Sequence, residues 1–411
     1  MRVRSSVVEV LAPSSEAEEV PRERLRAAPV WLTPLGLYGA VLSVLLLVSW
    51  WSISRFTETP DGMPPVSFRG EWFWDGWVRY DAGWYSIIAD TGYSYAPGVQ
   101  SPVAFFPGYP MVVRQVARLT DNIQLAGILV TLVCGALVLV AFHRWCRDRL
   151  DPAAAVTAVA CLALYPYAYY LYGAMYGDAL FVLLALVAFL AFERDHLLLA
   201  GLAGAAATGT RLVGVAVVAG LVVGVLERRR VLTRGEGRLP QVHLRRLAAR
   251  DAWVLLSIGG LAAWSSYLWR RFGDPLLFSS VQESWGQQSG LGTWLKRDFF
   301  ATIARWPDRF YTHGLVIQSA LGLLVLAATP TVVRRFGWRY GTYLVVLLLI
   351  PAIGSQDFQG LGRYLLGAFP AFAVLGAFLA ERPGLRRLVL PASAAVLVLF
   401  TGLFANGRYL S

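Results

Sequence analysis

The sequence predicts an all-α polytopic membrane protein, built as a bundle of about eleven transmembrane helices. Of its 411 residues, 56% are hydrophobic and only 15% are charged, and the mean hydropathy is +0.53. Apolar runs of near-membrane length recur almost to the C-terminus and leave no stretch for an independent soluble core. Residues 31–411 are therefore expected to form one integral membrane domain.

The apolar runs give the predicted helices in chain order. They cover residues 33–51, 123–142, 154–171, 178–192, 197–208, 212–226, 252–270, 314–333, 341–355, 364–380 and 387–405. Several are shorter than the roughly 20 residues that a straight span needs, so two of them are candidates for broken or re-entrant helices that line a cavity. Residues 1–30 mix Glu and Arg with few large apolar side chains, which predicts a disordered cytoplasmic tail.

The arginine-rich segments indicate the orientation in the plasma membrane. Each of them precedes the first predicted helix or follows an even-numbered one, as expected if all lie in the cytoplasm. They contain Arg22, Arg24 and Arg26; Arg144, Arg147 and Arg149; Arg228, Arg229, Arg230, Arg245 and Arg246; Arg334, Arg335 and Arg339; and Arg386 and Arg387. The N-terminus is then inside, and two long segments rich in aromatic residues, 55–120 and 271–313, lie outside.

The distribution of charged residues, cysteines and histidines argues against a nucleic-acid partner and against a metal site. The net charge is +11, but the basic residues gather in short loops between apolar runs, which encodes topology and argues against nucleic acid as a partner. The three cysteines and four histidines form no metal-ligand spacing. The sequence also lacks a glycine-rich phosphate loop and a DxD pair for a metal-bound nucleotide donor, so we expect neither a metal nor a cofactor.

The first outer segment holds the most informative acids, in the run EWFWDGWVRYDAGWYSIIADTGYSY from Glu71 to Tyr95. Asp81 lies four residues before Tyr85 on a predicted helix with one apolar side. A carboxylate there can take a proton from an incoming hydroxyl, which is the work of a general base. Asp75 is a second catalytic candidate. The alternative is that both acids pair with Arg79 or cap a helix.

Charged residues inside apolar stretches are the second signal, because a lone charge there costs a few kcal/mol. Arg211, in the sequence TGTRLVG, can hold a phosphate with two parallel hydrogen bonds or can extend to the membrane surface from a helix end. Arg363 and Tyr364 form another candidate phosphate site. Asp178 begins the fourth predicted helix and is expected to contact substrate or to cap that helix.

A family resemblance is carried by RYDAGWYSIIADTGYSY followed by AFFPGYP. This run resembles the first lumenal loop of the phosphatidylinositol-glycan class V (PIG-V) mannosyltransferase family, within the C superfamily (GT-C) of integral membrane glycosyltransferases. Weaker similarity continues in Tyr172–Leu186, Ala207–Gly214 and Gly362–Phe372. Two positions depart from the family pattern: Tyr80 replaces the usual tryptophan, and Asp178 stands where a serine-containing acidic motif is common.

The resemblance implies an inverting mannosyltransferase that acts on the extracytoplasmic face. The donor would be polyprenyl-phosphate mannose, a substrate rather than a cofactor, and the acceptor a hydroxyl of a lipid or glycan. Asp81 would deprotonate that hydroxyl, while Arg211 and Arg363 would stabilise the leaving phosphate. The expected substrate contacts are Arg79, Tyr85, Arg211, Arg363, Tyr364 and Asp178.

Two alternatives remain open from the sequence. The same fold can use polyprenyl-phosphate arabinose, glucose or galactose. A transporter or flippase for lipid-linked sugars would instead show an internal repeat and functional acids near the bilayer midplane. The sequence has no clear repeat, and its informative acids lie in an outer segment, so it favours the enzyme.

Overall fold

The computed structural model describes residues 32–55, 73–234, 240–287, 290–305 and 309–410. The expected cytoplasmic tail, residues 1–30, lies outside the described residues, and so does part of each expected outer segment.

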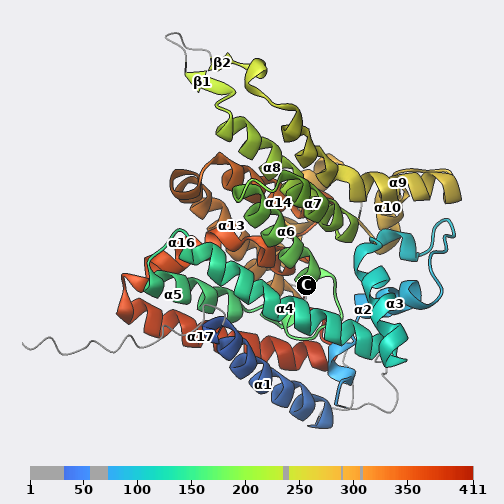
Figure 1. The fold of residues 1–411 in the computed structure, drawn as a ribbon. Coiled ribbons are helices and arrows are strands. Elements are labelled where there is room, and N and C mark those ends of the chain that lie inside the picture. The colour runs from blue at the N-terminus through green and yellow to red at the C-terminus, as the bar shows by residue number, and fades with distance from the viewer. Residues whose placement is uncertain (1–31, 56–72, 235–239, 288–289, 306–308, 411) are drawn as a thin grey trace, which may run out of the picture.

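The described chain is almost entirely helical (Figure 1). Its α-helices are α1 (Leu32–Arg55), α2 (Asp81–Asp90), α3 (Gly108–Thr120), α4 (Ile123–Arg147), α5 (Pro152–Ala163), α6 (Asp178–Glu193), α7 (Leu197–Thr210), α8 (Val215–Arg228), α9 (Gly259–Phe272), α10 (Leu277–Ser280), α11 (Leu291–Trp294), α12 (Arg297–Arg305), α13 (Arg309–Phe336), α14 (Trp338–Gly354), α15 (Leu361–Tyr364), α16 (Phe369–Ala380) and α17 (Pro383–Ala405). A short antiparallel pair, β1 (Leu232–Arg234) and β2 (Pro240–Val242), projects from the bundle, with Leu232 opposite Val242.

Each of the eleven apolar segments predicted from the sequence contains a helix. Within the described residues, five helices are long and apolar enough to cross a membrane: α1, α4, the continuous Ala249–Phe272 segment, α13 and α17. A sixth span is possible if Leu361–Gly367 and Phe369–Ala380, which meet at an angle of 79°, count as one broken span. The expected membrane fold is confirmed, whereas eleven crossings stay a prediction.

The prediction of one helix over residues 154–171 is wrong in its second half. Helix α5 ends at Ala163, and the chain resumes as a 3-10 turn at Ala168–Leu171. Pro166 explains the break, because proline has no backbone N–H and disfavours helical geometry at the residue before it.

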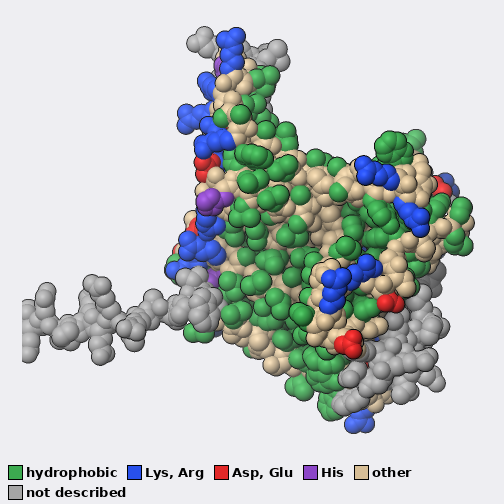
Figure 2. Space-filling view, turned by 45° about the vertical axis from the view of Figure 1, so that its right-hand side comes forward, with side chains coloured by type: hydrophobic (Ala, Val, Ile, Leu, Met, Phe, Trp, Pro, Cys, Tyr) green, Lys and Arg blue, Asp and Glu red, His purple; other side chains and the backbone are tan. Residues whose placement is uncertain are grey.

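Small residues allow the helices to approach closely. Gly376 of α16 lies against the backbone of Ala158 in α5, and Gly135 of α4 lies against the carbonyl of Leu171. Such small-residue contacts are typical of helix packing in membranes. Large apolar side chains remain exposed on the outside of the bundle, including Leu323 and Leu388, and Figure 2 shows hydrophobic side chains over much of one face. This surface suits a lipid environment.

The two expected outer segments pack against each other at one end of the bundle. Val103 and Phe106, from the first segment, form a small apolar core with Trp264 of α9 and with Leu277 and Phe278 of α10. Figure 1 shows α2 and α3 beside α9 and α10. This packing holds α2, which begins at Asp81, against the bundle.

Candidate active site

A strained turn presents Asp81 as the first residue of α2. The preceding residue, Tyr80, has φ of 52°, a left-handed value that costs a non-glycine residue about 1–3 kcal/mol. Its hydroxyl donates to the carbonyl of Gly407, and its ring lies 4.8 Å from that of Tyr409. The backbone N–H of Asp81 donates to the hydroxyl of Tyr176 over 3.2 Å. The C-terminal segment therefore fixes the turn that carries the candidate base.

Asp81 forms an ion pair with Arg363, although 282 positions separate them in the sequence. Arg363 Nη1 lies 2.6 Å from Asp81 Oδ2, and the two side chains are 13% and 18% exposed. The guanidinium carbon lies 5.4 Å from the ring centre of Tyr176 and 5.7 Å from that of Tyr364. Arg363 Nε is buried and has no hydrogen-bond partner among the described residues. The ion pair with Asp81 therefore leaves one N–H group of the guanidinium without an acceptor among the described residues.

A second ion pair, between Arg211 and Asp178, lies beside the first. Arg211 has extended backbone at the break between α7 and α8, and Asp178 is the first residue of α6. Their side chains are 9% and 3% exposed. The guanidinium carbon of Arg211 lies 4.4 Å from the ring centre of Tyr364. Tyr364 therefore contacts both arginines and joins the two ion pairs into one cluster.

The other predicted pair, Asp75 and Arg79, is arranged differently. Arg79 Nη2 lies 2.6 Å from Asp75 Oδ2, and Arg79 Nε donates to the carbonyl of Ala405 over 2.9 Å. Arg79 is buried and ties the first outer segment to the end of α17. Asp75 therefore pairs with Arg79, which is the alternative to a catalytic role that the sequence left open for Asp75.

Aromatic side chains surround the two ion pairs. The ring centre of Tyr85 lies 5.1 Å from that of Tyr109 and 6.0 Å from that of Tyr176. Burial raises the pKa of Tyr85, so its hydroxyl stays a hydrogen-bond donor at neutral pH. Trp285, from the second outer segment, packs 5.8 Å from Trp84 of α2. The second outer segment thus contacts the helix that carries Asp81.

A lysine connects the second outer segment to the loop before Arg363. Lys296 is the only lysine of the chain, and its Nζ donates to the carbonyl of Ser355. The same atom lies 4.8 Å from the ring centre of Phe358. Burial lowers the pKa of Lys296 to about 8, and the nearby Asp357 opposes that shift.

The structure brings together six of the eight residues that the sequence singled out: Asp81, Tyr85, Asp178, Arg211, Arg363 and Tyr364. The sequence reasoning missed Tyr176, Trp285 and Tyr409. Tyr176 belongs to the YGD motif that supplied Asp178, so that motif is the signal that could have indicated it. Among the described residues, no group of three or more His, Cys, Asp or Glu side chains is arranged to hold a metal ion.

Comparison with known proteins gives a structural match without a sequence match. No protein-family model matches the chain, and none of the curated proteins matches it. ArnT from Cupriavidus metallidurans, in a crystal structure bound to undecaprenyl phosphate, aligns at a TM-score of 0.51 and 16% identity over 91% of this chain and 77% of ArnT. Its apo crystal structure gives the same score and identity, over 91% and 76% of the two chains.

An archaeal oligosaccharyltransferase from Archaeoglobus fulgidus aligns less well, with a TM-score of 0.45 and 13% identity over 91% of this chain and 56% of that protein. At 16% identity, the match to ArnT establishes a shared fold. The chain has the GT-C-like membrane fold that its sequence predicts and that ArnT shares.

Proposed function

We propose that this protein is a membrane glycosyltransferase that moves a sugar from a polyprenyl phosphate to an acceptor hydroxyl. One observation carries the proposal: four segments far apart in the sequence meet in one cluster. They contribute Asp81, Asp178, Arg211 and the Arg363–Tyr364 pair. The shared fold with ArnT, whose crystal structure contains undecaprenyl phosphate, supports a lipid phosphate as the donor group.

The arginines suit the phosphate of the donor. Arg211 and Arg363 contact the same ring, that of Tyr364, and a guanidinium binds phosphate oxygens through a planar fork of N–H groups. Arg363 Nε, which has no hydrogen-bond partner in the described part of the chain, supplies a further donor for the phosphate. An incoming phosphate competes with Asp81 for Arg363, so donor binding would release the carboxylate beside the sugar.

The released carboxylate would then act as the base. One Asp81 oxygen takes the proton from the acceptor hydroxyl, and the acceptor oxygen attacks the anomeric carbon from the face opposite the phosphate. The bond between the anomeric carbon and the phosphate oxygen breaks, and its electron pair goes to the phosphate. Arg211 and Arg363 stabilise the new negative charge. One displacement inverts the anomeric centre.

The proposal also names the sugar and the class of acceptor. Mannose follows from the resemblance of the first outer segment to PIG-V mannosyltransferases, and a lipid or glycan hydroxyl is the expected acceptor. Arabinose, glucose and galactose are the competing sugars. Each is distinguished by offering the purified protein one labelled polyprenyl-phosphate sugar at a time.

The test of the base compares two aspartates of the same helix. Asp81→Asn should lower transfer of labelled sugar by roughly 10²–10⁴-fold, the usual contribution of a positioned general base. Asp90→Asn removes an exposed acid at the other end of α2 and should leave transfer unchanged. Equal activity of the two variants would remove Asp81 from the base role. Movement of intact labelled donor across vesicles, without transfer, would favour a transporter.

The proposed orientation places the active site outside the cytoplasm and the arginine-rich end inside. The described cysteines, Cys134, Cys146 and Cys161, are all buried, so single new cysteines report accessibility with little background. A membrane-impermeant maleimide should label Val99→Cys in intact cells, and Arg245→Cys only after permeabilisation. Both positions are exposed. The reverse labelling pattern would invert the orientation.

A further inference from the structure

Helix α6 connects the candidate active site to a second charged cluster. Asp178 begins the helix and Glu193 ends it, so at about 1.5 Å per residue the two carboxylates lie roughly 22 Å apart along its axis. Helix α4 packs against α6 and runs parallel to it, from Ile123, which lies beside α3, to Arg147. The second cluster therefore lies at the opposite end of the bundle.

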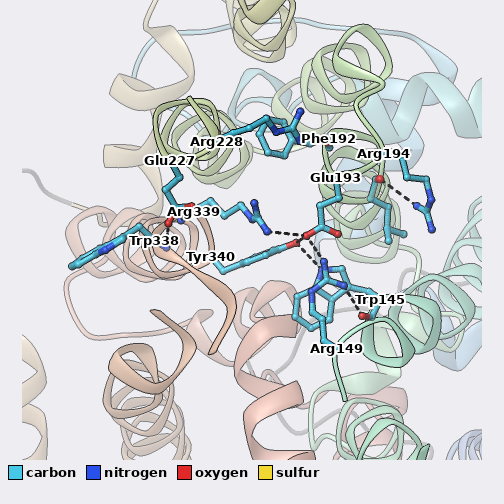
Figure 3. Close-up of polar contacts among 11 residues, drawn as sticks. Trp145, Arg149, Phe192, Glu193, Arg194, Glu227, Arg228, Trp338, Arg339 and Tyr340 are labelled. Carbon is cyan, nitrogen blue, oxygen red and sulfur yellow. Dashed lines mark hydrogen bonds and ion pairs between the residues drawn. The ribbon is translucent and has the colours of Figure 1, made fainter. Parts of the chain in front are cut away.

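Glu193 is the centre of this cluster, as Figure 3 shows. Its Oε1 pairs with Arg149, lies 3.3 Å from Arg339 Nη2 and accepts from the hydroxyl of Tyr340 over 2.6 Å. The indole N–H of Trp145 donates to the same hydroxyl over 2.7 Å. The single negative charge of Glu193 is thus shared between Arg149 and Arg339, so it does not fully neutralise either arginine.

A hollow of about 520 Å³ opens beside Glu193 and is rich in positive charge. It is lined by Arg144, Asp148, Arg149, Glu193, Arg194, Arg228 and Arg339. Five arginines thus face two carboxylates, and one of the five, Arg228, also pairs with Asp195 next to the hollow. Asp148 is shared between Arg144 at 3.4 Å and Arg194 at 3.8 Å, so both contacts are loose. Arg339 Nε is buried without a hydrogen-bond partner among the described residues.

Local helix capping accounts for only part of these arginines. Arg149 Nη1 donates to the carbonyl of Trp145 and Arg194 Nη1 to that of Leu190, which satisfies free carbonyls at helix C-termini. Arg144 and Arg194 nevertheless keep about half of their side-chain surface exposed, at 52% and 44%. Both side chains line the hollow.

An apolar hollow lies next to the cationic one. It measures about 510 Å³ and is lined by Asp195, His196, Leu197, Leu198, Leu199, Arg250 and Trp253. Asp195 pairs with Arg228 of the cationic hollow at 2.6 Å, which joins the two. The apolar span of α4 ends at Arg147, so both hollows lie at the level where a bilayer changes from hydrocarbon to headgroups.

We propose that the cationic hollow binds the phosphate-bearing headgroup of an anionic membrane lipid. The arginines hold the phosphate oxygens, and an acyl chain of the lipid lies over the apolar hollow at Leu198 and Leu199. Basic pockets between membrane helices commonly bind such headgroups. This site is separate from the candidate active site and does not depend on the proposed transfer reaction.

The test measures lipid binding directly. The purified full-length protein in detergent is titrated with short-chain phosphatidylglycerol, phosphatidylcholine or inorganic phosphate, and bound copies are counted by native mass spectrometry. Arg144→Gln combined with Arg194→Gln should weaken phosphatidylglycerol binding roughly 25-fold, at roughly fivefold for each arginine. Asp148→Asn removes a competing anion and should strengthen it.

The matched control combines Arg147→Gln with Arg245→Gln, which removes two exposed charges outside both sets of lining residues. Control binding should stay within about twofold of wild type. An equal loss in both double variants would overturn the proposal, because diffuse surface charge would explain the attraction. Inorganic phosphate that binds as tightly as phosphatidylglycerol would also overturn it, since the ligand would then be a free phosphate and not a lipid.

Discussion

Carboxylates and arginines gather at both ends of α6, but in different proportions. At the Asp178 end, each carboxylate has one arginine: Asp178 pairs with Arg211, and Asp81 pairs with Arg363. At the Glu193 end, one carboxylate serves Arg149 and Arg339, and more arginines line an open hollow.

The difference lies in burial and balance. The Asp178 end is enclosed by aromatic rings and has one carboxylate for each arginine, so the proposed donor phosphate would compete there with a carboxylate for an arginine. The Glu193 end has surplus positive charge in contact with solvent, so an anion binds there without displacing anything. The paired charges at the Asp178 end suit the proposed reaction, in which charge moves to the phosphate. The surplus positive charge at the Glu193 end suits the proposed lipid headgroup, which stays bound.

The largest expected effect is on the free energy of unfolding. If it is not observed, the proposed difference between the two ends of α6 is wrong. Asp178→Asn leaves Arg211 buried without its anion, which should lower the free energy of unfolding by about 3–5 kcal/mol. Glu193→Gln leaves two arginines that can reach water, and should cost about 1 kcal/mol or less. Denaturant titration of the purified protein measures both. Equal losses would mean that the two ends do not differ in burial.

The next effect concerns catalysis and sharpens the comparison. Arg363→Lys keeps the charge but loses the planar fork, and should lower kcat/KM for sugar transfer by roughly 10²–10³-fold, as for loss of one transition-state donor. Arg339→Lys makes the same exchange at the other end and should change kcat/KM less than about twofold. A comparable loss in both variants would show that the Glu193 end contributes to transfer.

The smallest effect concerns Lys296, whose positive charge near the candidate active site depends on pH. Its pKa of about 8 is lower than the ordinary 10.5. The unfolded chain binds the proton more tightly, so this lysine makes folding more favourable as pH rises from about 8 to 10.5, and its unfavourable contribution is complete below 8.

Acetylation measures this pKa without ambiguity, because mass spectrometry identifies the single lysine of the chain. The rate should rise with an inflection near pH 8. Asp357→Asn should move the inflection lower, since Asp357 favours the charged form. An inflection near 10.5 in the folded protein would contradict the buried environment.

The sequence predicted the helices well because membrane spans are defined by apolar length, which a sequence displays directly. All eleven segments contain helices. The breaks were harder to place: Pro166 ends α5 early, and the chain bends by 79° before Phe369. Pro166 is visible in the sequence, but where each helix ends also depends on tertiary contacts that accept an interrupted backbone, and one sequence does not show these contacts.

The charged residues of the candidate site could be predicted from the sequence, because a charge in an apolar stretch is costly and therefore rare. The aromatic residues of the site could not, because aromatic residues are common along the whole chain. Arg211 and Asp178 stood out because charges are rare in apolar stretches, but their pairing was not expected. Tyr176 and Tyr409 did not stand out, since aromatic residues make up 13% of the chain. The partner of Asp81 was out of reach, because 282 residues separate it from Arg363 and only the fold brings them together.

The turn at Tyr80 has a consequence for how the protein is made. Its strained conformation is held by Gly407, 327 residues further along the chain. At roughly 5–20 residues per second, a ribosome needs roughly 15–65 s to reach that residue after making Tyr80. During this interval the turn lacks the contact with Gly407, so the candidate base reaches its final position only after the C-terminal segment has been made.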